Sequence, residues 1–145
     1  MNTKMMHELK RFNYIATEID AAYHKAAQKL GITDSAMMIL YFVCDNGGSR
    51  MLSDICRLSG VSKQTINSAL RKLETEGIVT LNASGGKKKT VTLTEAGKEY
   101  AKEKVLPIMK IENEIFSEWT KQQREMYLSL TQSFLDSFKE KISKL

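Results

Sequence analysis

The sequence predicts a mainly α-helical protein with one small β-hairpin, and three observations lead to this fold class. In several long stretches, apolar residues recur three and four positions apart, which is the spacing of one helix face. Two neighbouring segments, 78–82 and 90–93, are instead rich in β-branched residues, as strands are. Glycines separate these stretches, whereas proline occurs once, as Pro107. A chain of 145 residues can form one domain or two closely joined lobes.

The N-terminal third predicts two helices. Residues 5–30 form the first, which has an apolar stripe along one side: Phe12, Ile15, Ile19, Ala22, Tyr23, Ala26 and Leu30. Thr33 can cap the next helix, over 36–46, which is apolar on nearly every side. A helix of this kind belongs at the centre of a fold.

Residues 52–76 predict two short helices joined by a tight turn. The first covers 52–59, and Ser62 can cap the second, which ends near Glu76. Such a turn needs a small residue on the first helix, a left-handed residue between the helices and an apolar residue facing back. Cys56, Gly60 and Ile66 meet these needs in that order. We therefore predict a helix-turn-helix.

Two further helices follow the strands. Thr94 can cap a long helix over 95–119, which Pro107 should kink because its ring removes a backbone donor and clashes one turn back. Thr120 and Gln123 fit a capping box that starts the last helix. The predicted architecture is a winged helix-turn-helix lobe flanked by long N- and C-terminal helices. We expect one domain over 1–145, with the lobe at 33–97 and a dimerisation frame at 1–30 and 98–145.

The lobe also predicts nucleic-acid binding. Between residues 62 and 89, six Lys and Arg residues against two Glu give an excess of four positive charges, close to the net +5 of the whole chain. Gln64, Asn67 and Ser68 lie opposite the apolar stripe of the second helix and are candidates for base edges, and Arg71 for a guanine or a phosphate. The residues expected at phosphates are Ser62, Lys63, Thr65, Lys87, Lys88 and Lys89, and Lys72 is expected to bind DNA without an assigned role. Lys63 and Lys72, each taken alone, fit ordinary solvated lysines equally well.

The stretch SDICRLSGVSKQTINSALRKLETEGIV, with VTLTEAG after the hairpin, resembles the MarR family of bacterial regulators. The resemblance covers nearly the whole chain in length and in the order of elements. It implies a homodimer whose two winged lobes grip successive major grooves of double-stranded DNA. It also implies a sequence-specific transcriptional regulator, commonly a repressor, that releases its pseudo-palindromic operator when a small molecule or an oxidant is present.

The hairpin tip departs from the family pattern. Members usually carry an Asp, one intervening residue and an Arg that enters the minor groove, and these positions match Gly85 and Lys87. Lysine is a point charge that cannot reproduce the flat fork of arginine. Attraction to phosphates is expected from this tip, whereas minor-groove reading stays open.

The terminal helices predict association of two copies. The last helix carries a stripe that is too apolar for a free helix, and the first helix offers a matching surface. The residues expected at this dimer interface are Phe12, Ile15, Ile19, Phe134, Leu135, Phe138, Ile142 and Leu145. Packing within one chain is the alternative. An effector pocket, which the resemblance implies, could include Tyr14, Met37, Met38 and Tyr41, although methionines at such positions also fit plain core packing.

Two rival functions stay open. One is a winged helix that contacts another protein and has no DNA target, and the other is a thiol switch through Cys44 or Cys56, which we otherwise expect to be reduced core residues. The sequence shows no catalytic triad, phosphate-binding glycine motif or spaced metal ligands, so we expect no enzyme, cofactor or metal site. Without a signal-peptide pattern or a long apolar run, a cytoplasmic protein with no membrane partner is expected.

Overall fold

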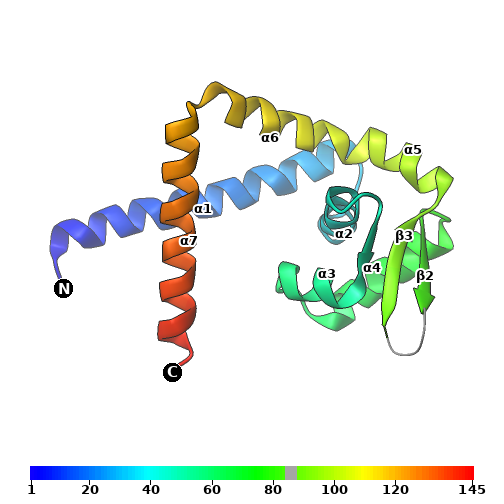
Figure 1. The fold of residues 1–145 in the computed structure, drawn as a ribbon, viewed down its shortest axis with the longest axis horizontal. Helices are drawn as coiled ribbons and strands as arrows, with labels where there is room; N and C mark the ends of the chain where they lie inside the picture. The colour runs from blue at the N-terminus through cyan, green and yellow to red at the C-terminus, as the bar shows by residue number, and fades with distance from the viewer. Residues whose placement is uncertain (84–87) are drawn as a thin grey trace. The chain divides into compact units, whose positions relative to one another are not determined.

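The computed structural model describes residues 1–83 and 88–145, which form two compact units, Met1–Ile108 and Met109–Leu145 (Figure 1). The elements are, in chain order, α1 (Thr3–Leu30), α2 (Asp34–Asp45), β1 (Ser49–Met51), α3 (Leu52–Ser59), α4 (Lys63–Thr75), β2 (Val79–Ala83), β3 (Lys89–Leu93), α5 (Glu95–Lys104), α6 (Leu106–Glu118) and α7 (Lys121–Ile142). The predicted fold class, mainly α-helical with a small antiparallel sheet, is confirmed.

α2 lies at the centre of the first unit, as its apolar sequence predicts. Ile39, Leu40 and Val43 on this helix are completely buried. The helix contacts α1, α3, α4, α5 and two of the strands. Ile55 of α3 and Ile66 of α4 are also completely buried. The core therefore holds both short helices of the helix-turn-helix against one central helix.

The tight turn between α3 and α4 has the predicted geometry. Gly60 adopts a left-handed backbone with φ 64°, which favours glycine, and its N–H donates to the carbonyl oxygen of Cys56 (3.3 Å). Ser62 then caps α4, since its hydroxyl oxygen accepts from the N–H of Thr65 (3.3 Å). The boundaries of α4 thus follow from local signals in the sequence.

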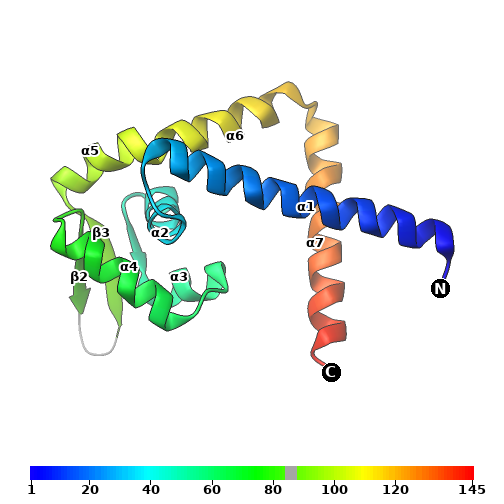
Figure 2. The ribbon, with the colours of Figure 1, turned by 180° about the vertical axis from the view of Figure 1, so that it is seen from behind.

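The sheet has three strands, one more than the predicted hairpin. β3 pairs antiparallel with β2 on one side and with β1 on the other, which gives the order β1-β3-β2. β1 has only three residues, too few to show the alternation by which strands are recognised. The hydroxyl oxygens of Ser49 and Thr92 lie 2.9 Å apart across this extra pair. The hairpin of β2 and β3, hereafter the wing, lies beside α4 (Figure 2).

A close contact joins the base of the wing to the start of α5. The Thr94 hydroxyl donates to the carbonyl oxygen of Gly77 (2.5 Å), and its oxygen accepts from the N–H of Gly97 (2.9 Å) as the helix cap. The N–H of Thr94 donates to the carbonyl oxygen of Ile78 (3.1 Å). An added Cβ at Gly97 would lie 1.9 Å from that same oxygen. Glycine is therefore required here, and the end of α4, the wing and α5 are held together.

α5 and α6 replace the single kinked helix that was predicted over 95–119. The helix is interrupted at Val105, two residues before Pro107. Proline cannot donate to the carbonyl one turn back, and its ring crowds that carbonyl, so the regular ladder breaks on the N-terminal side. The N–H of Ile108 bonds instead to the carbonyl oxygen of Val105 (3.0 Å). Val105 is completely buried, so the interruption lies in the core.

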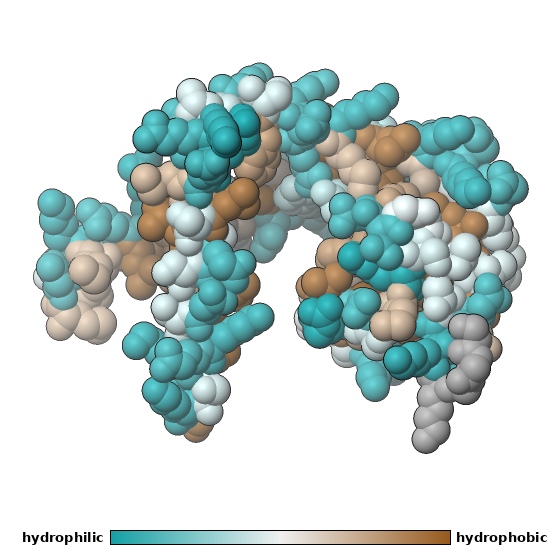
Figure 3. All heavy atoms as spheres, in the orientation of Figure 1, coloured by the Kyte–Doolittle hydropathy of each residue, from teal (hydrophilic) through white to brown (hydrophobic). Residues whose placement is uncertain are grey.

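α1 and α7 keep most of their apolar side chains at the surface of the single chain. Ala27 is the only buried residue of α1, and α7 has none. Figure 3 shows hydrophobic side chains open to solvent on both helices. Among the described residues, no helix combines the length and the apolar composition that a membrane crossing requires.

The second unit contains the predicted capping box at the start of α7. The Thr120 hydroxyl accepts from the N–H of Gln123 (3.1 Å), and the side-chain oxygen of Gln123 accepts from the N–H of Thr120 (2.9 Å). Two N–H groups at the helix start, which have no partner within the helix, are satisfied in this way.

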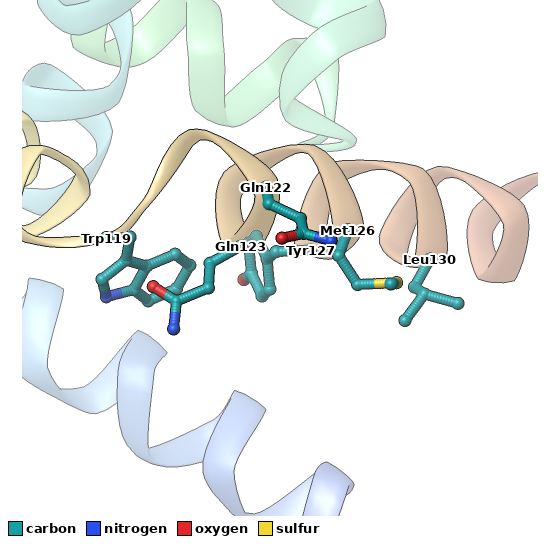
Figure 4. Close-up of a pocket in the computed structure, with 6 residues that line it drawn as sticks. All are labelled: Trp119, Gln122, Gln123, Met126, Tyr127 and Leu130. Atoms are coloured by element: carbon teal, nitrogen blue, oxygen red, sulfur yellow. The ribbon is translucent and has the colours of Figure 1, made fainter.

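An aromatic cluster supports the same corner and was not predicted. The rings of Phe116, Trp119 and Tyr127 pack with centroids between 5.1 and 6.1 Å apart. The guanidinium of Arg124 donates to the carbonyl oxygens of Phe116 (3.2 Å) and Trp119. Beside the cluster lies an open hollow of about 600 Å³ (Figure 4). It is lined by Trp119, Gln122, Gln123, Met126, Tyr127 and Leu130.

We predict that Gly97→Ala destabilises the protein by about 1–3 kcal/mol, because the new methyl group must push the Ile78 carbonyl away. Thermal unfolding followed by circular dichroism measures this loss. The control is Ala96→Ser on the exposed neighbouring position, expected within about 0.5 kcal/mol of the parent. Equal melting temperatures for Gly97→Ala and the parent would contradict the assigned contact.

Candidate nucleic-acid interface

α4 buries one side and exposes the other. The predicted apolar stripe is confirmed, since Ile66, Leu70 and Leu73 are all buried. The residues of α4 that were predicted to contact DNA are all exposed: Lys63, Gln64, Thr65, Asn67, Ser68, Arg71 and Lys72. A helix with 3.6 residues per turn brings positions 64, 67, 68 and 71 to the same side. α4 thus presents a row of hydrogen-bonding and cationic side chains on a rigid support.

The start of α4 combines a cap with exposed polar groups. Besides capping the helix, the Ser62 hydroxyl lies 3.0 Å from the hydroxyl oxygen of Thr65, and either atom can be the donor. One of the two hydroxyl hydrogens therefore remains for a ligand. Lys63 adds a cation at this helix N-terminus, where backbone N–H groups favour anions.

The wing contributes two exposed lysines from the described residues. Lys88 precedes β3, and Lys89 is its first residue, paired with Ala83 of β2. Lys89 has the same strand parity as the buried Val91 and Leu93, so it belongs to the sheet face that turns toward the core. Gly85 and Lys87, the positions matched to the family's Asp and Arg, lie outside the described residues.

A groove of about 280 Å³ runs between α4 and the wing. It is lined by Asn67, Leu70, Arg71, Glu74, Val79, Leu81 and Lys89. Three of the predicted DNA-binding residues, Asn67, Arg71 and Lys89, therefore meet in one place although they come from two elements. We refer to this feature as the α4–wing groove.

A sequence model of the MarR family matches residues 30–89, which include α2, the helix-turn-helix and most of the wing. Residues 30–89 belong to the MarR family. The match supports a DNA-binding transcriptional regulator. Among curated proteins, none matches the sequence significantly.

Solved MarR-family structures share the fold of this chain. A regulator from Neisseria meningitidis has a TM-score of 0.83 at 18% identity, and 99% of both chains is covered. Staphylococcus aureus MarR, solved with salicylate and kanamycin, gives 0.69 at 20% identity and covers 93% of this chain and 94% of its own. Staphylococcus aureus MepR, solved with DNA, gives 0.67 at 17% identity with coverage of 89% and 96%. At these identities the likeness establishes the fold.

Sequence reasoning missed some residues of the groove beside the MarR-family helix-turn-helix. Glu74 was counted only as a charge, although its spacing from Asn67 and Arg71 along α4 already put it on their side. Val79 and Leu81 were recognised as strand residues, but their contact with this side of α4 depends on how the wing crosses the helix. No local pattern in the sequence reports that crossing.

The residues predicted for the dimer interface are exposed in the single chain. On α1 they are Phe12, Ile15 and Ile19, and toward the C-terminus they are Phe134, Leu135, Phe138, Ile142 and Leu145. Their exposed fractions run from 42% upward, which is high for large apolar side chains. The interface itself stays a prediction.

The four residues predicted for an effector pocket do not share one environment. Met37, Met38 and Tyr41 are half-buried on α2, whereas Tyr14 on α1 is 59% exposed, with the Lys10 ammonium 5.6 Å from its ring centre. The two hollows described above have other linings. The pocket therefore stays a prediction.

No group of three or more His, Cys, Asp or Glu residues arranged for a metal is found in 1–83 and 88–145.

Both cysteines are free thiols, but they are half-buried rather than fully in the core as expected. Cys44 lies in the last turn of α2, and Cys56 lies in the second half of α3. Partial burial raises the pKa of the Cys44 thiol above its usual range, because a thiolate would lose hydration there. A raised pKa lowers the thiolate fraction at neutral pH and so disfavours Cys44 as a redox sensor.

We predict that Cys44 reacts with iodoacetamide more slowly than a cysteine in an unstructured peptide at neutral pH. The midpoint of its pH dependence should lie above that of the peptide, because the folded thiol releases its proton at higher pH. The unfolded chain ionises first, so this group stabilises the fold less as pH rises beyond the ordinary cysteine pKa. Peptide mapping of Cys56→Ser follows Cys44 alone. Alkylation as fast as in the peptide would contradict the assignment.

Proposed function

We propose that this protein is a sequence-specific regulator of transcription that binds double-stranded DNA as a homodimer. The observation that carries the proposal is the exposed polar side of α4 beside a lysine-bearing wing, in a MarR-family lobe. MepR, which shares the fold, was solved on DNA, and this supports the same use of the lobe here. A duplex would accept α4 in its major groove and the wing along the flanking backbone.

Each polar residue then has a role set by its chemistry. Gln64, Asn67 and Ser68 face the base edges. Ser62, Lys63 and Thr65 hold a phosphate at the start of α4, and the lysines of the wing lie along the backbone. A dimer that makes about eight phosphate contacts would show a slope of log affinity against log salt near −7.

Homodimerisation is the part of the proposal that rests on α1 and α7. Each helix exposes a stripe of large apolar side chains that water solvates poorly. A second copy offers the same two stripes, and a two-fold axis brings the same surface of both copies together. Two lobes related in this way fit a pseudo-palindromic site whose half-sites lie about one helical turn apart.

Repression and release by a small molecule complete the proposal. Staphylococcus aureus MarR, a protein of the same fold, was solved with salicylate and kanamycin, which supports small-molecule control in this chain. The candidate pocket remains Tyr14, Met37, Met38 and Tyr41, in which methionines can repack around a ligand. The division into a lobe over 33–97 and a dimerisation frame at 1–30 and 98–145 belongs to the same proposal, as does a cytoplasmic location.

We expect Phe138→Glu to weaken the dimer by roughly 30-fold or more, because a carboxylate replaces a central apolar contact. Sedimentation equilibrium measures the dissociation constant. Ser133→Glu adds the same charge on the opposite side of α7 and should leave the dimer intact. The interface assignment fails if the two variants dimerise equally well.

Replacing Lys87, Lys88 and Lys89 together by Ala should weaken binding to every duplex and flatten the salt dependence, because phosphate contacts carry no sequence information. Gln64→Ala should instead change which sequence is preferred, at about 1–3 kcal/mol per lost base contact. Fluorescence anisotropy on mixed-sequence duplex and on the DNA flanking the gene measures both effects. If the parent protein does not bind DNA even in dilute buffer, the proposed function is wrong.

A further inference from the structure

The α4–wing groove has a direction, and its two ends differ in charge. α4 runs into the base of the wing through Gly77, and β2 then runs back beside it, so early residues of α4 face late residues of β2. Asn67 and Arg71 therefore lie toward the C-terminal end of β2, and Glu74 lies toward the base of the wing, where Val79 begins β2. Lys89 pairs with Ala83 at the tip end of the strand ladder. One end of the groove therefore carries the amide of Asn67 and the cations of Arg71 and Lys89. The other end, at the base of the wing, carries the carboxylate of Glu74.

Strand alternation explains why Lys89, rather than Lys88, lines the groove. Val91 and Leu93 occupy the inward positions of β3 and are buried, and Lys89 takes the next inward position beyond the core. Lys88 precedes the strand and is absent from the lining. Lys89 of β3 and Arg71 of α4 therefore line the same groove from its two walls.

The lining also has an apolar part, made by Leu70, Val79 and Leu81. A hollow with a cationic end and an apolar floor suits a sugar–phosphate unit, which is anionic at the phosphate and largely apolar on the face of the deoxyribose. At about 280 Å³ it lies just below the range of drug-sized ligand sites. The carboxylate of Glu74 keeps a second anion out of the base end by like-charge repulsion.

We infer that the α4–wing groove seats one sugar–phosphate unit of the DNA backbone, that Arg71 and Lys89 share its phosphate, and that Glu74 sets where along the groove this phosphate lies. The inference rests on the proposed function, since it presumes that the lobe meets a duplex. It removes Arg71 from the base readers and pairs it with a residue of the wing. It also gives the acidic Glu74 a positioning role inside a cationic surface.

The salt dependence of binding tests the sharing of one phosphate. Full-length protein is titrated onto a labelled mixed-sequence duplex over a salt series, for the parent, Arg71→Gln, Lys89→Gln and the double variant. If both cations serve one phosphate, either alone still neutralises it, and each single variant keeps nearly the parent slope. The double variant should lose one phosphate per lobe, and its slope should be shallower by about 1.8 for the dimer.

Lys88 supplies the matched control, because it is a neighbouring lysine that does not line the groove. Lys88→Gln combined with Arg71→Gln should show the sum of the two single effects, whereas Lys89→Gln with Arg71→Gln should not. Additive slopes for Arg71 and Lys89 overturn the shared phosphate. A changed base preference in Arg71→Gln at an unchanged salt slope overturns it too, since Arg71 would then read a base.

The role of Glu74 is tested against Glu76, which carries the same charge two residues further on and does not line the groove. Glu74→Gln should tighten binding to any duplex about two- to fivefold more than Glu76→Gln does. In the Arg71→Gln, Lys89→Gln background this difference should disappear, because no phosphate is then held in the groove. Equal effects of the two glutamates refute the positioning role.

These outcomes separate the inference from the function on which it rests. A parent that binds duplex DNA with a steep salt slope, while the variants follow the overturning patterns, leaves the regulator intact and removes the groove assignment. A parent without salt-dependent DNA binding removes both.

Discussion

The close approach of Gly97 to the Ile78 carbonyl is the constraint on which the DNA-facing surface depends. Together with the hydrogen bonds that the Thr94 hydroxyl makes to the Gly77 carbonyl oxygen and to the Gly97 N–H, it holds the base of the wing between the end of α4 and the start of α5. The width of the α4–wing groove is set by this joint, because β2 leaves it directly beside α4. A wing that tilted at its base would move Lys89 away from Arg71. The glycine is thus a structural requirement with a consequence at the binding surface.

Strand register decides which charges face the groove. In a strand, a slip of one residue exchanges the two faces, so the present pairing of Lys89 with Ala83 is what places Lys89 on the inward face. The pairing of β1 with β3 and the contact of Ser49 with Thr92 pin that register from the other edge. β1, although only three residues long, therefore helps to place Lys89 at the first position of β3. The burial of Val91 and Leu93 in the core stabilises the same register.

Local signals made much of this fold predictable from the sequence. The caps at Thr33, Ser62, Thr94 and Thr120 all form as predicted, because a cap depends on residues within three positions of it. The left-handed Gly60 and the apolar stripe of α4 were predictable for the same reason. β1, the α4–wing groove and the aromatic corner depend on contacts between distant segments or on crossing angles, which no local pattern reports. Glu74 is an example. The sequence predicts which side of α4 it occupies, but not that this side faces the wing.

The exposed apolar faces of α1 and α7 connect association to DNA recognition. An isolated helix in water is only marginally stable, and α7 has no buried residue in the single chain. On the proposed function, a second copy covers these faces and also supplies the second winged lobe. Once one lobe is bound, the other binds as an intramolecular event at high effective concentration. A single lobe with a few phosphate contacts would bind weakly at cellular salt, so weakening the apolar pairing of two chains must weaken DNA binding although no DNA-facing residue is altered.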